Sequence, residues 1–302
     1  MAYEEKRVLP IFILFLNGKA GARKKINAVF CFLLLFLDIM ERSEWCILKL
    51  KGTIGMIVKT EEDLEGLKKI GRLVAFIRDE LKEKAKPGVT TKELDELAGR
   101  IFAENGAISG PKGEYDFPGY TCISVNDEVA HGIPGNKVLQ EGDLVNVDVS
   151  GSLNGYYADT GISFVAGKGN PELTALCECA ERAFERGLTK IRAGKKQNQI
   201  GRAVEKETYG SGFNVLLNLT GHGVGRALHE DPEYILNYYD PEDTDLLKDG
   251  MVIAFEPFVS TGAEEVVETG DGWTYKTPDG SLVAQVEHTV IVTKGKPIVL
   301  TR

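Results

Sequence analysis

Four acidic residues of this 302-residue chain stand out because they lie in or beside apolar, strand-forming stretches. Asp148 lies within Leu-Val-Asn-Val-Asp-Val, Glu256 follows Met-Val-Ile-Ala-Phe, and Glu287 lies within Val-Ala-Gln-Val-Glu-His-Thr-Val-Ile-Val. A buried ionised carboxylate needs a partner of opposite charge, and no Lys or Arg lies near Asp148 in the sequence. Each acid taken alone fits a half-exposed strand equally well. Together with the fourth, Asp159, they indicate a site that binds cations.

The turn between Asp148 and Asp159 predicts how these two carboxylates are arranged. Asn154-Gly155 is a strong short signal for a β-hairpin. A two-residue turn there places Ser150 opposite Asp159, and Asp148 shares the face of Ser150 because side chains alternate along a strand. The aspartates are then diagonal neighbours, about 7 Å apart at the backbone. Two exposed strand-end acids are the ordinary alternative, but buried carboxylates at this spacing require protonation or bridging cations.

The chain contains four histidines, His131, His222, His229 and His288. The first three lie in glycine-rich or turn-like contexts, where an imidazole can face a cleft, although a lone histidine is more often an ordinary core or surface residue. His288 directly follows Glu287, so we expect it to face the opposite side of its strand in an ordinary packing role. Four carboxylates and a histidine suit a pair of divalent ions. Ions about 3.5–4 Å apart activate water and polarise a carbonyl or phosphoryl group.

The elements that position these residues occur in two similar sets. Hydrophobic spacing and capping residues predict helix, helix and strands at 60–84, 90–106, 121–125 and 144–149, and again at 171–191, 197–209, 213–217 and 251–255. Gly88 precedes Gly106 by 18 residues, as Gly194 precedes Gly212. The segments 139–148 and 247–256 both begin with Leu, carry Gly three residues later and end on a carboxylate. Two related halves imply a pseudo-twofold domain with the site at the seam.

Composition limits the classes of function. The net charge of −9 argues against non-specific nucleic-acid binding, which relies on clustered Lys and Arg. The cysteines are odd in number and form no pair of Cys-x-x-Cys motifs, so we interpret them as reduced thiols of a cytosolic protein. They are Cys31, Cys46, Cys122, Cys177 and Cys179.

The first 55 residues differ from the rest of the chain. They carry nine basic and five acidic residues, whereas residues 56–302 carry 27 and 40. Their apolar runs, 8–16 and 28–37, are far shorter than the ~20 residues that span a bilayer. We interpret 1–55 as an atypical leader from translated upstream sequence, with Met56 as the natural start and 56–302 as the catalytic domain. A genuine extension and a membrane anchor are the alternatives, and the intact mass of the native product distinguishes a start at Met1.

Several motifs together resemble the methionine aminopeptidases, and specifically the type I group. The resemblance runs from Met56 to the C-terminus. It rests on Asn-Asp-Glu-Val-Ala-His131-Gly-Ile-Pro, Val-Asp148-Val, Ala-Asp159-Thr, Gly-His222-Gly-Val-Gly-Arg-Ala-Leu-His229-Glu, Phe-Glu256-Pro and Gln-Val-Glu287-His-Thr.

This resemblance implies an α/β pita-bread fold, a pseudo-twofold antiparallel sheet with helices outside, and a role for each motif residue. The implied metal ligands are Asp159 and Glu287, which bridge two ions, Asp148 on one ion, and His222 with Glu256 on the other. Glu256 is also the implied general base. His131 and His229 match the pair that binds substrate and stabilises the transition state.

The resemblance also implies an apolar pocket for a methionine side chain. Phe117, Cys122 and Trp273 match its lining positions, with core packing as the ordinary alternative for each. Leu228 stands where many relatives carry an aromatic residue, and Pro111 where some carry a cysteine. These two departures concern the shape of the pocket and not the reaction.

The expected activity is removal of the initiator methionine from nascent polypeptides, at the ribosome and in the cytoplasm. The expected cofactors are two divalent ions, of Co, Mn, Fe or Zn. A monomer that binds neither nucleic acid nor membrane is the expected state.

Three alternatives remain open. An X-Pro aminopeptidase or creatinase-like hydrolase shares the fold but typically carries a large N-terminal domain, for which 55 residues are too few. A type II enzyme carries an insertion in its second half, whereas Glu256 here follows His229 by only 27 positions. A non-catalytic binding protein on this fold loses metal ligands, whereas this chain retains all five.

Overall fold

The computed structural model describes residues 55–302, so the interpretations of the N-terminal leader lie outside the described part. Five helices are present among these residues: α2 (Glu61–Lys84), α3 (Thr91–Glu104), α4 (Gly110–Tyr115), α5 (Pro171–Leu188) and α6 (Asn198–Gly210). None of them is both long and apolar enough to cross a bilayer. The predicted helix pairs are confirmed, although α5 ends three residues before the predicted position 191 and α6 begins one residue after 197.

Short β-strands account for most of the remaining regular structure. In the first half they are β1 (Ile108–Ser109), β2 (Cys122–Val125), β3 (Glu128–Ala130), β4 (Leu144–Leu153) and β5 (Tyr156–Val165). In the second half they are β6 (Asn214–Val215), β7 (Gly221–Gly223), β8 (Glu230–Ile235), β9 (Val252–Phe255), β10 (Phe258–Ser260), β11 (Val267–Glu268), β12 (Tyr275–Lys276), β13 (Val283–Gln285), β14 (His288–Ile291) and β15 (Ile298–Val299).

Capping boxes start the two helices of the first half. Thr60 accepts from the backbone N–H of Asp63, whose carboxylate accepts from Thr60 N in return at 3.2 Å. Thr90 and Glu93 repeat this arrangement at the start of α3. Each box satisfies two amide groups that the helix leaves without partners. The sequence signal at these helix starts is therefore a direct consequence of hydrogen bonding.

The β4–β5 hairpin forms as the Asn154-Gly155 turn predicts. Both turn residues have positive φ, 54° and 76°, as a two-residue hairpin of this type requires. The observed register pairs Ser150 with Asp159, which confirms the prediction, and it pairs Asp148 with Gly161. Strands β1 and β2 both pair with β4, so the hairpin is the centre of the first sheet.

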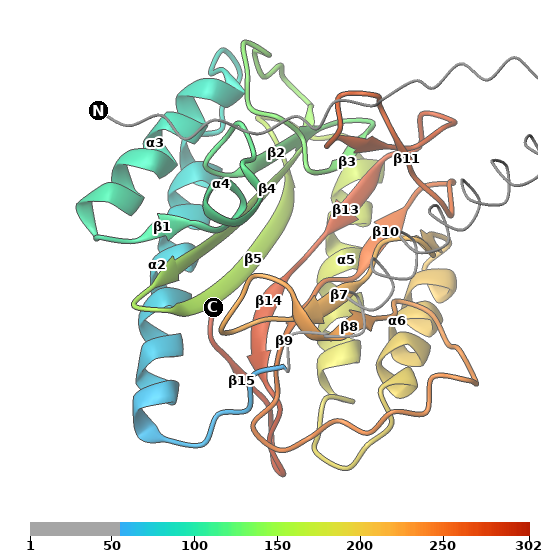
Figure 1. Ribbon diagram of the computed structural model, residues 1–302. Helices are drawn as coiled ribbons and strands as arrows, with labels where there is room; N and C mark the ends of the chain where they lie inside the picture. Colours follow the sequence, from blue (N-terminus) through green and yellow to red (C-terminus); the bar gives the residue numbers. More distant parts are fainter. Residues whose placement is uncertain (1–54) are drawn as a thin grey trace, which may run out of the picture. The chain divides into compact units, whose positions relative to one another are not determined.

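The second half forms a five-stranded sheet in the order β15-β14-β9-β7-β8. It meets the first sheet at Gly161 and Glu287. Gly161 N donates to Glu287 O at 3.3 Å, and Glu287 N donates to Gly161 O at 2.8 Å. Figure 1 shows β5 running beside β13 and β14 along this junction. The backbone of one predicted ligand, Glu287, thus joins the two halves.

Equivalent hydrogen bonds confirm the predicted internal echo. Gly88 N donates to Leu139 O at 2.8 Å, and Gly194 N donates to Leu247 O at 2.8 Å. Both glycines have positive φ, 96° and 80°, which side-chain-bearing residues rarely adopt. The similar sequence patterns around Gly88 and Gly194 therefore correspond to the same type of turn in each half.

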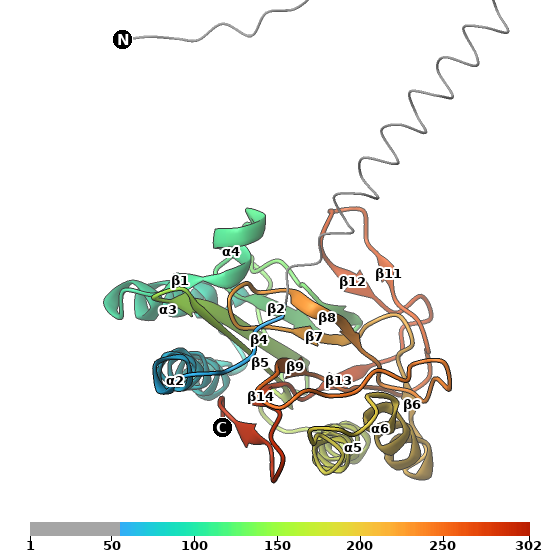
Figure 2. The same cartoon turned by 60° about the horizontal axis from the view of Figure 1, so that its bottom comes forward.

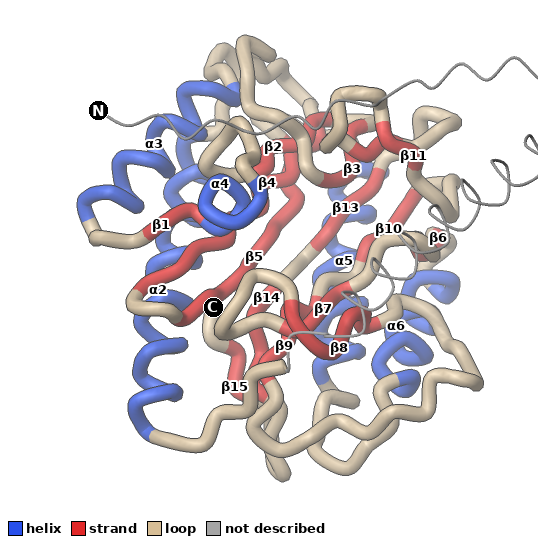
Figure 3. The backbone as a smooth tube through the Cα atoms, in the orientation of Figure 1, coloured by secondary structure: helices blue, strands red, loops and turns tan. Residues whose placement is uncertain are grey.

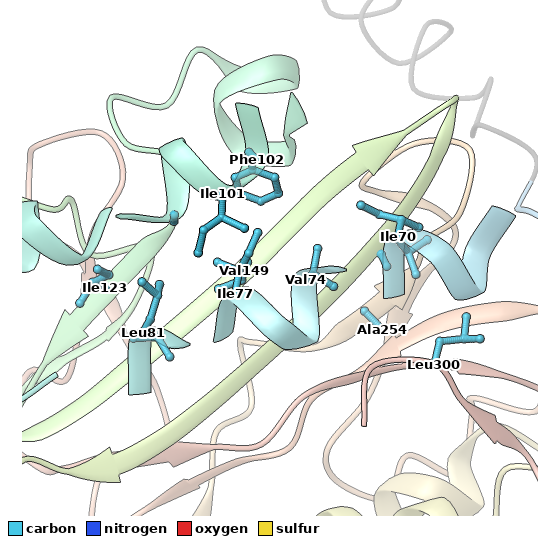
Figure 4. Close-up of a cluster of buried hydrophobic side chains, with 14 of the residues drawn as sticks. Ile70, Val74, Ile77, Leu81, Ile101, Phe102, Ile123, Val149, Ala254 and Leu300 are labelled. Carbon is cyan, nitrogen blue, oxygen red and sulfur yellow. The ribbon is translucent and has the colours of Figure 1, made fainter. Parts of the chain in front are cut away.

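One face of α2 forms the centre of the first hydrophobic core. Ile70, Val74, Ile77 and Leu81 are fully buried, and Figure 4 shows them directed at the β4–β5 hairpin and at Phe102. In the second half, Phe184 of α5 stacks on Phe255 of β9, with ring centroids 5.1 Å apart. Figure 2 shows α2, α5 and α6 along one side of the strands, with α4 and the β11–β12 hairpin on the other.

Loops complete the second half. Figure 3 shows the long connection from β8 to β9 passing beside α6, where Asn198 Nδ2 donates to Asp240 O at 2.9 Å. Gly201, in the first turns of α6, faces the same loop. A Cβ atom at Gly201 would lie 2.0 Å from the carbonyl oxygen of Tyr238.

We expect Gly201→Ala to destabilise the protein by about 1–3 kcal/mol, because neither the helix nor the loop backbone can move freely. Urea unfolding measures the effect. Gly210→Ala in the same helix is the matched control, since a Cβ there has no neighbour within 4 Å, and it should stabilise by about 0.5–1 kcal/mol. Equal effects of the two substitutions would contradict the steric explanation.

Candidate active site

A cavity of about 560 Å³ contains all the residues predicted to act chemically. The five predicted metal ligands line it: Asp148, Asp159, His222, Glu256 and Glu287. So do the five residues predicted to contact substrate: His131, His229, Phe117, Cys122 and Trp273. Residues separated by as many as 170 positions are thus brought together, as a site at the seam requires.

Different elements contribute the five polar ligand candidates. Asp148 and Asp159 project from the two strands of the β4–β5 hairpin. His222 is the middle residue of β7, Glu256 directly follows β9, and Glu287 lies between β13 and β14. Asp148, Asp159 and His222 lie within paired strands, and Glu256 and Glu287 directly adjoin strand ends, so the strand ladders hold all five side chains on a rigid frame.

His222 has a defined tautomer. Its Nδ1 lies 2.9 Å from Gly223 O, which can only accept, so Nδ1 carries the hydrogen. Burial lowers the pKa of His222 to about 4, so the ring is neutral at pH 7. The lone pair of Nε2 then faces Glu256 Oε1 at 3.5 Å and Asp159 Oδ2 at 3.8 Å. Electron-rich atoms this close repel each other unless a cation lies between them.

The carboxylates show the same unfavourable crowding. Burial raises the pKa of Asp148 to about 6. Burial, followed by the charge of Asp148, raises the pKa of both Asp159 and Glu256 well above the usual range. Burial and the charge of Asp159 do the same for Glu287. Four acids that each resist ionisation next to the others form a strong site for divalent cations.

Glu287 supplies the most specific observation. Its side chain is 1% exposed, and among the described residues its Oε2 has no hydrogen-bond partner. An ionised buried oxygen without a partner is costly. A Cβ at position 161 would lie 2.9 Å from this oxygen, so Gly161 leaves room beside it. Glu287 lines the cavity, so a cation bound there would supply the partner that this oxygen lacks.

The donor set fits divalent metal ions. Ligand atoms of Asp159, His222 and Glu287 all lie within 4.8 Å of one another. Hard carboxylate oxygens combined with one neutral imidazole suit Mn, Fe, Co and Zn. Asp148 and Glu256 border this cluster and extend it beyond a single set of three ligands.

Sequence reasoning missed the residues that support the proposed ligands. Gln285 Nε2 donates to Glu256 Oε2 at 2.9 Å. Asn146 Nδ2 in turn donates to Gln285 Oε1 at 2.8 Å, and all three side chains are buried. Gln285 is two residues before Glu287, so the alternation of side chains along a strand could have placed both on the same face.

His131 and His229, the two histidines predicted to contact substrate, both line the cavity. The rings of His222 and His229 stack with centroids 4.0 Å apart. His131 lies in the left-handed region, with φ of 55°, and burial lowers its pKa. Tyr115, which sequence reasoning also missed, places its hydroxyl 2.8 Å from His229 Nδ1.

The apolar part of the cavity is built from the predicted pocket residues. The rings of Phe117 and Trp273 meet edge to face, 5.1 Å between centroids. Cys122 is buried and lies opposite Asp148 in the β2–β4 pairing. Leu228 and Pro111, the two departures from the family pattern, also line the cavity. An apolar wall thus lies beside the charged cluster.

His288 does not line the cavity, in agreement with the ordinary role expected for it. Its Nδ1 lies 2.9 Å from Thr301 Oγ1, and its ring packs edge-on against Phe184. The buried guanidinium of Arg78 lies beside it and donates to Thr160 Oγ1 at 2.6 Å. Thr160 Oγ1 donates to Glu287 O at 2.9 Å. This cluster supports the ligand-bearing strands from behind.

Comparison with known proteins agrees with this geometry. The chain is 61% identical over 248 residues to the methionine aminopeptidase 2 of Bacillus subtilis (strain 168), an alignment that covers 82% of this chain and 100% of that protein. It superposes on the crystal structure of the methionine aminopeptidase from Thermotoga maritima with a TM-score of 0.78 and 36% identity, covering 82% of this chain and 100% of that one.

A more distant neighbour shares the fold alone. The prolidase from Pyrococcus horikoshii OT3 superposes with a TM-score of 0.65 at 22% identity, over 82% of this chain and 63% of that chain. Together with the antiparallel sheets described above, these likenesses confirm the pita-bread fold. A model of metallopeptidase family M24 matches residues 65–294. Because that match spans every residue of the cavity cluster, the chain belongs to metallopeptidase family M24.

Proposed function

We propose that this chain removes the N-terminal methionine from nascent proteins, as a type I methionine aminopeptidase with two divalent metal ions. Residues 56–302 are its proposed catalytic domain. The proposed setting is the cytoplasm, at the ribosome, where a monomer meets new N-termini. The interval of 27 positions from His229 to Glu256 leaves no room for a type II insertion and supports the type I assignment.

One observation carries the proposal: a single cavity joins a five-residue ligand cluster to an apolar wall. Hydrolysis of the first peptide bond needs the scissile carbonyl near the ligands and the first side chain in an apolar pocket. Phe117, Cys122 and Trp273 offer such a pocket for a thioether, because soft sulfur packs well against aromatic edges. The chain aligns with the full length of the methionine aminopeptidase 2 of Bacillus subtilis, which supports the same reaction.

Asp148, Asp159, His222, Glu256 and Glu287 would hold the ions. When bound, two divalent ions lower the pKa of water and polarise a carbonyl group. The chain itself contributes the proton acceptor. Gln285 Nε2 donates to Oε2 of Glu256, which leaves Oε1 free to take a proton from the attacking water.

His131 and His229 act on the substrate as neutral donors. Partial burial raises the pKa of Tyr115 to about 12, so its phenol stays protonated. In the tautomer that we propose, this hydroxyl donates to His229 Nδ1, 2.8 Å away. His229 then carries its own hydrogen on Nε2. An N–H at this position can donate to the oxygen that gains charge as the carbonyl is attacked.

Replacing Tyr115 by Phe is expected to lower kcat about tenfold with little change in KM. The substitution removes one hydrogen bond, worth about 1–1.5 kcal/mol, while the ring remains. Steady-state kinetics on a methionyl tripeptide measure the effect. Tyr209→Phe is the control, since Tyr209 lies on α6, is 44% exposed and does not line the cavity. An unchanged kcat in Tyr115→Phe would show that His229 needs no such support.

The test of the proposed function is hydrolysis of Met-Ala-Ser by metal-free protein before and after addition of Mn²⁺ or Co²⁺. Metal-restored release of free methionine, lost in His222→Ala, is the expected result. Activity restricted to X-Pro peptides would assign the chain to the prolidase branch of the fold. Absence of hydrolysis with every metal would favour a non-catalytic binding protein.

A further inference from the structure

Positive charge is concentrated in one part of this acidic protein. Residues 182–206 contain eight basic and two acidic residues, although the whole chain has a net charge of −9. The segment comprises the end of α5, the connecting turn and most of α6. The net charge of the whole chain therefore conceals a strongly basic segment.

These cations surround a second cavity, the α5–α6 groove, of about 500 Å³. Arg186, Lys190, Arg202 and Lys206 line it. Its one acid is Glu207, which pairs with Arg186 at 3.3 Å and with Arg182 at 2.9 Å, so its charge is already balanced.

The remaining cations of the groove have no acidic partners in the described part of the chain. Within residues 55–302, Lys190, Arg202 and Lys206 form no ion pair with a carboxylate. Three unpaired, solvent-exposed cations on adjoining helix surfaces repel one another, and an anion bound between them relieves that repulsion.

The other half of the molecule shows that the fold does not require these charges. The echo between Gly88 and Gly194 aligns residues 182–206 with residues 76–100. Residues 76–100 likewise form two helices joined by a turn, but they carry six basic and six acidic residues. The same architecture is neutral in one half and strongly basic in the other, so the basic charge is a property of this surface and not of the helix pair.

We infer that the α5–α6 groove binds the phosphate backbone of RNA. This interaction goes beyond the proposed peptidase function and differs from the expectation, drawn from net charge alone, that the chain avoids nucleic acid. A partner protein is less well suited, because protein interfaces depend on buried aromatic and aliphatic anchors. The groove is lined by charged and polar side chains, with Ala203 as its single apolar residue.

The position of the groove leaves the substrate cavity open. Figure 2 shows α5 and α6 on one side of the strands and α4, which carries Tyr115 of the cavity, on the other. RNA bound at the groove would therefore not cover the catalytic residues. The β11–β12 hairpin, next to the cavity, contains Glu268 and Asp271, which repel phosphate and favour this orientation.

The test uses the full 302-residue chain and a fluorescein-labelled single-stranded RNA of about 15 nucleotides, a length within the reach of such sites. Fluorescence anisotropy is recorded between about 50 and 200 mM KCl. With three to four phosphate contacts, we expect the logarithm of the affinity to fall with the logarithm of salt with a slope of roughly −2 to −3. Reversing two charges, Arg202→Glu with Lys206→Glu, should weaken binding about 20-fold at ~100 mM salt and flatten the slope.

The matched control reverses Lys69 and Arg72, two exposed cations of α2 that also form no ion pair within the described residues 55–302. Both double variants have the same net charge and retain residues 1–54, so differences between them report the groove. Loss confined to the groove variant supports the inference. The inference would be overturned if both variants lost RNA affinity equally or if the unaltered chain bound no RNA at low salt. Equally tight binding of a labelled polyglutamate would also overturn it. Met-Ala-Ser hydrolysis should be the same in all three proteins, which separates this result from the peptidase assignment.

Discussion

Replacing Glu287 by Gln is expected to reduce hydrolysis of methionyl peptides roughly a thousandfold. The substitution preserves shape but removes a buried charge that faces the other proposed ligands, and metal-assisted chemistry contributes several kcal/mol of the barrier reduction. Glu287 Oε2, without a hydrogen-bond partner among the described residues, is the atom most dependent on a cation. Single-turnover rates with saturating Mn²⁺ measure the loss directly.

The same variant makes a prediction about stability that does not depend on activity. For the unaltered chain, metal at 100 times its Kd should stabilise the fold by about 2.7 kcal/mol. In Glu287→Gln this increment should largely disappear, while the metal-free variant should melt above the metal-free parent because one repelling carboxylate is gone. Thermal unfolding in EDTA and in Mn²⁺ gives both values.

Glu104→Gln is the control, since Glu104 is exposed at the end of α3 and loses the same charge. It should leave both the rate and the metal-dependent shift unchanged. If Glu287→Gln retains the full metal-dependent shift, Glu287 is not a ligand.

The second large effect is expected at Phe184. Its side chain is 1% exposed, stacks on Phe255 and packs edge-on against His288 with centroids 5.0 Å apart. Phe184→Ala removes a large side chain from between a helix and two strands, so we expect a loss of about 3–5 kcal/mol in the free energy of unfolding. Urea denaturation checks this value.

Phe184→Leu tests the origin of that loss. Leu fills most of the volume and should cost much less, about 1–2 kcal/mol. Because Phe255 directly precedes Glu256, the Ala variant should also lose metal affinity, whereas the Leu variant should retain it. Equal losses for Ala and Leu would mean that the aromatic stacking itself, and not the cavity, determines the cost.

Much of the fold follows from local sequence signals. The Asn154-Gly155 turn determines the register of the hairpin, and the register determines that Asp148 and Asp159 are diagonal neighbours. The echo of glycines in the sequence corresponds to two turns with equivalent hydrogen bonds. These predictions succeeded because a hairpin turn and a helix end depend on residues only a few positions apart.

The hydrogen bonds that support the site residues could not be predicted from the sequence, because they join positions far apart in the chain. Tyr115 meets His229 across 114 positions, and Arg78 reaches Thr301 O across 223. No periodicity in one sequence encodes which distant polar groups will meet. The exact end of α5 was also missed, because the last residues of the predicted helix instead form the turn in which Lys190 N donates to Gly187 O at 2.8 Å.

The net charge of the chain likewise does not predict where charged side chains gather in the fold. Net charge treats every residue as if it were at the same place, whereas the fold places Arg186, Lys190, Arg202 and Lys206 around one groove. Spacing along α6 alone would have placed Arg202 and Lys206 on one helix face, since they are four residues apart. The neighbouring face of α5 required the packing of the two helices.

The Gly161–Glu287 junction has a consequence for how this enzyme could be divided. The first half supplies Asp148 and Asp159, and the second supplies His222, Glu256 and Glu287. Neither fragment of a chain split between β5 and α5 would contain all five proposed metal ligands. Each fragment should therefore be inactive alone, and peptidase activity should return only when the two fragments associate. Peptidase activity would then report whether two proteins fused to the fragments bind each other.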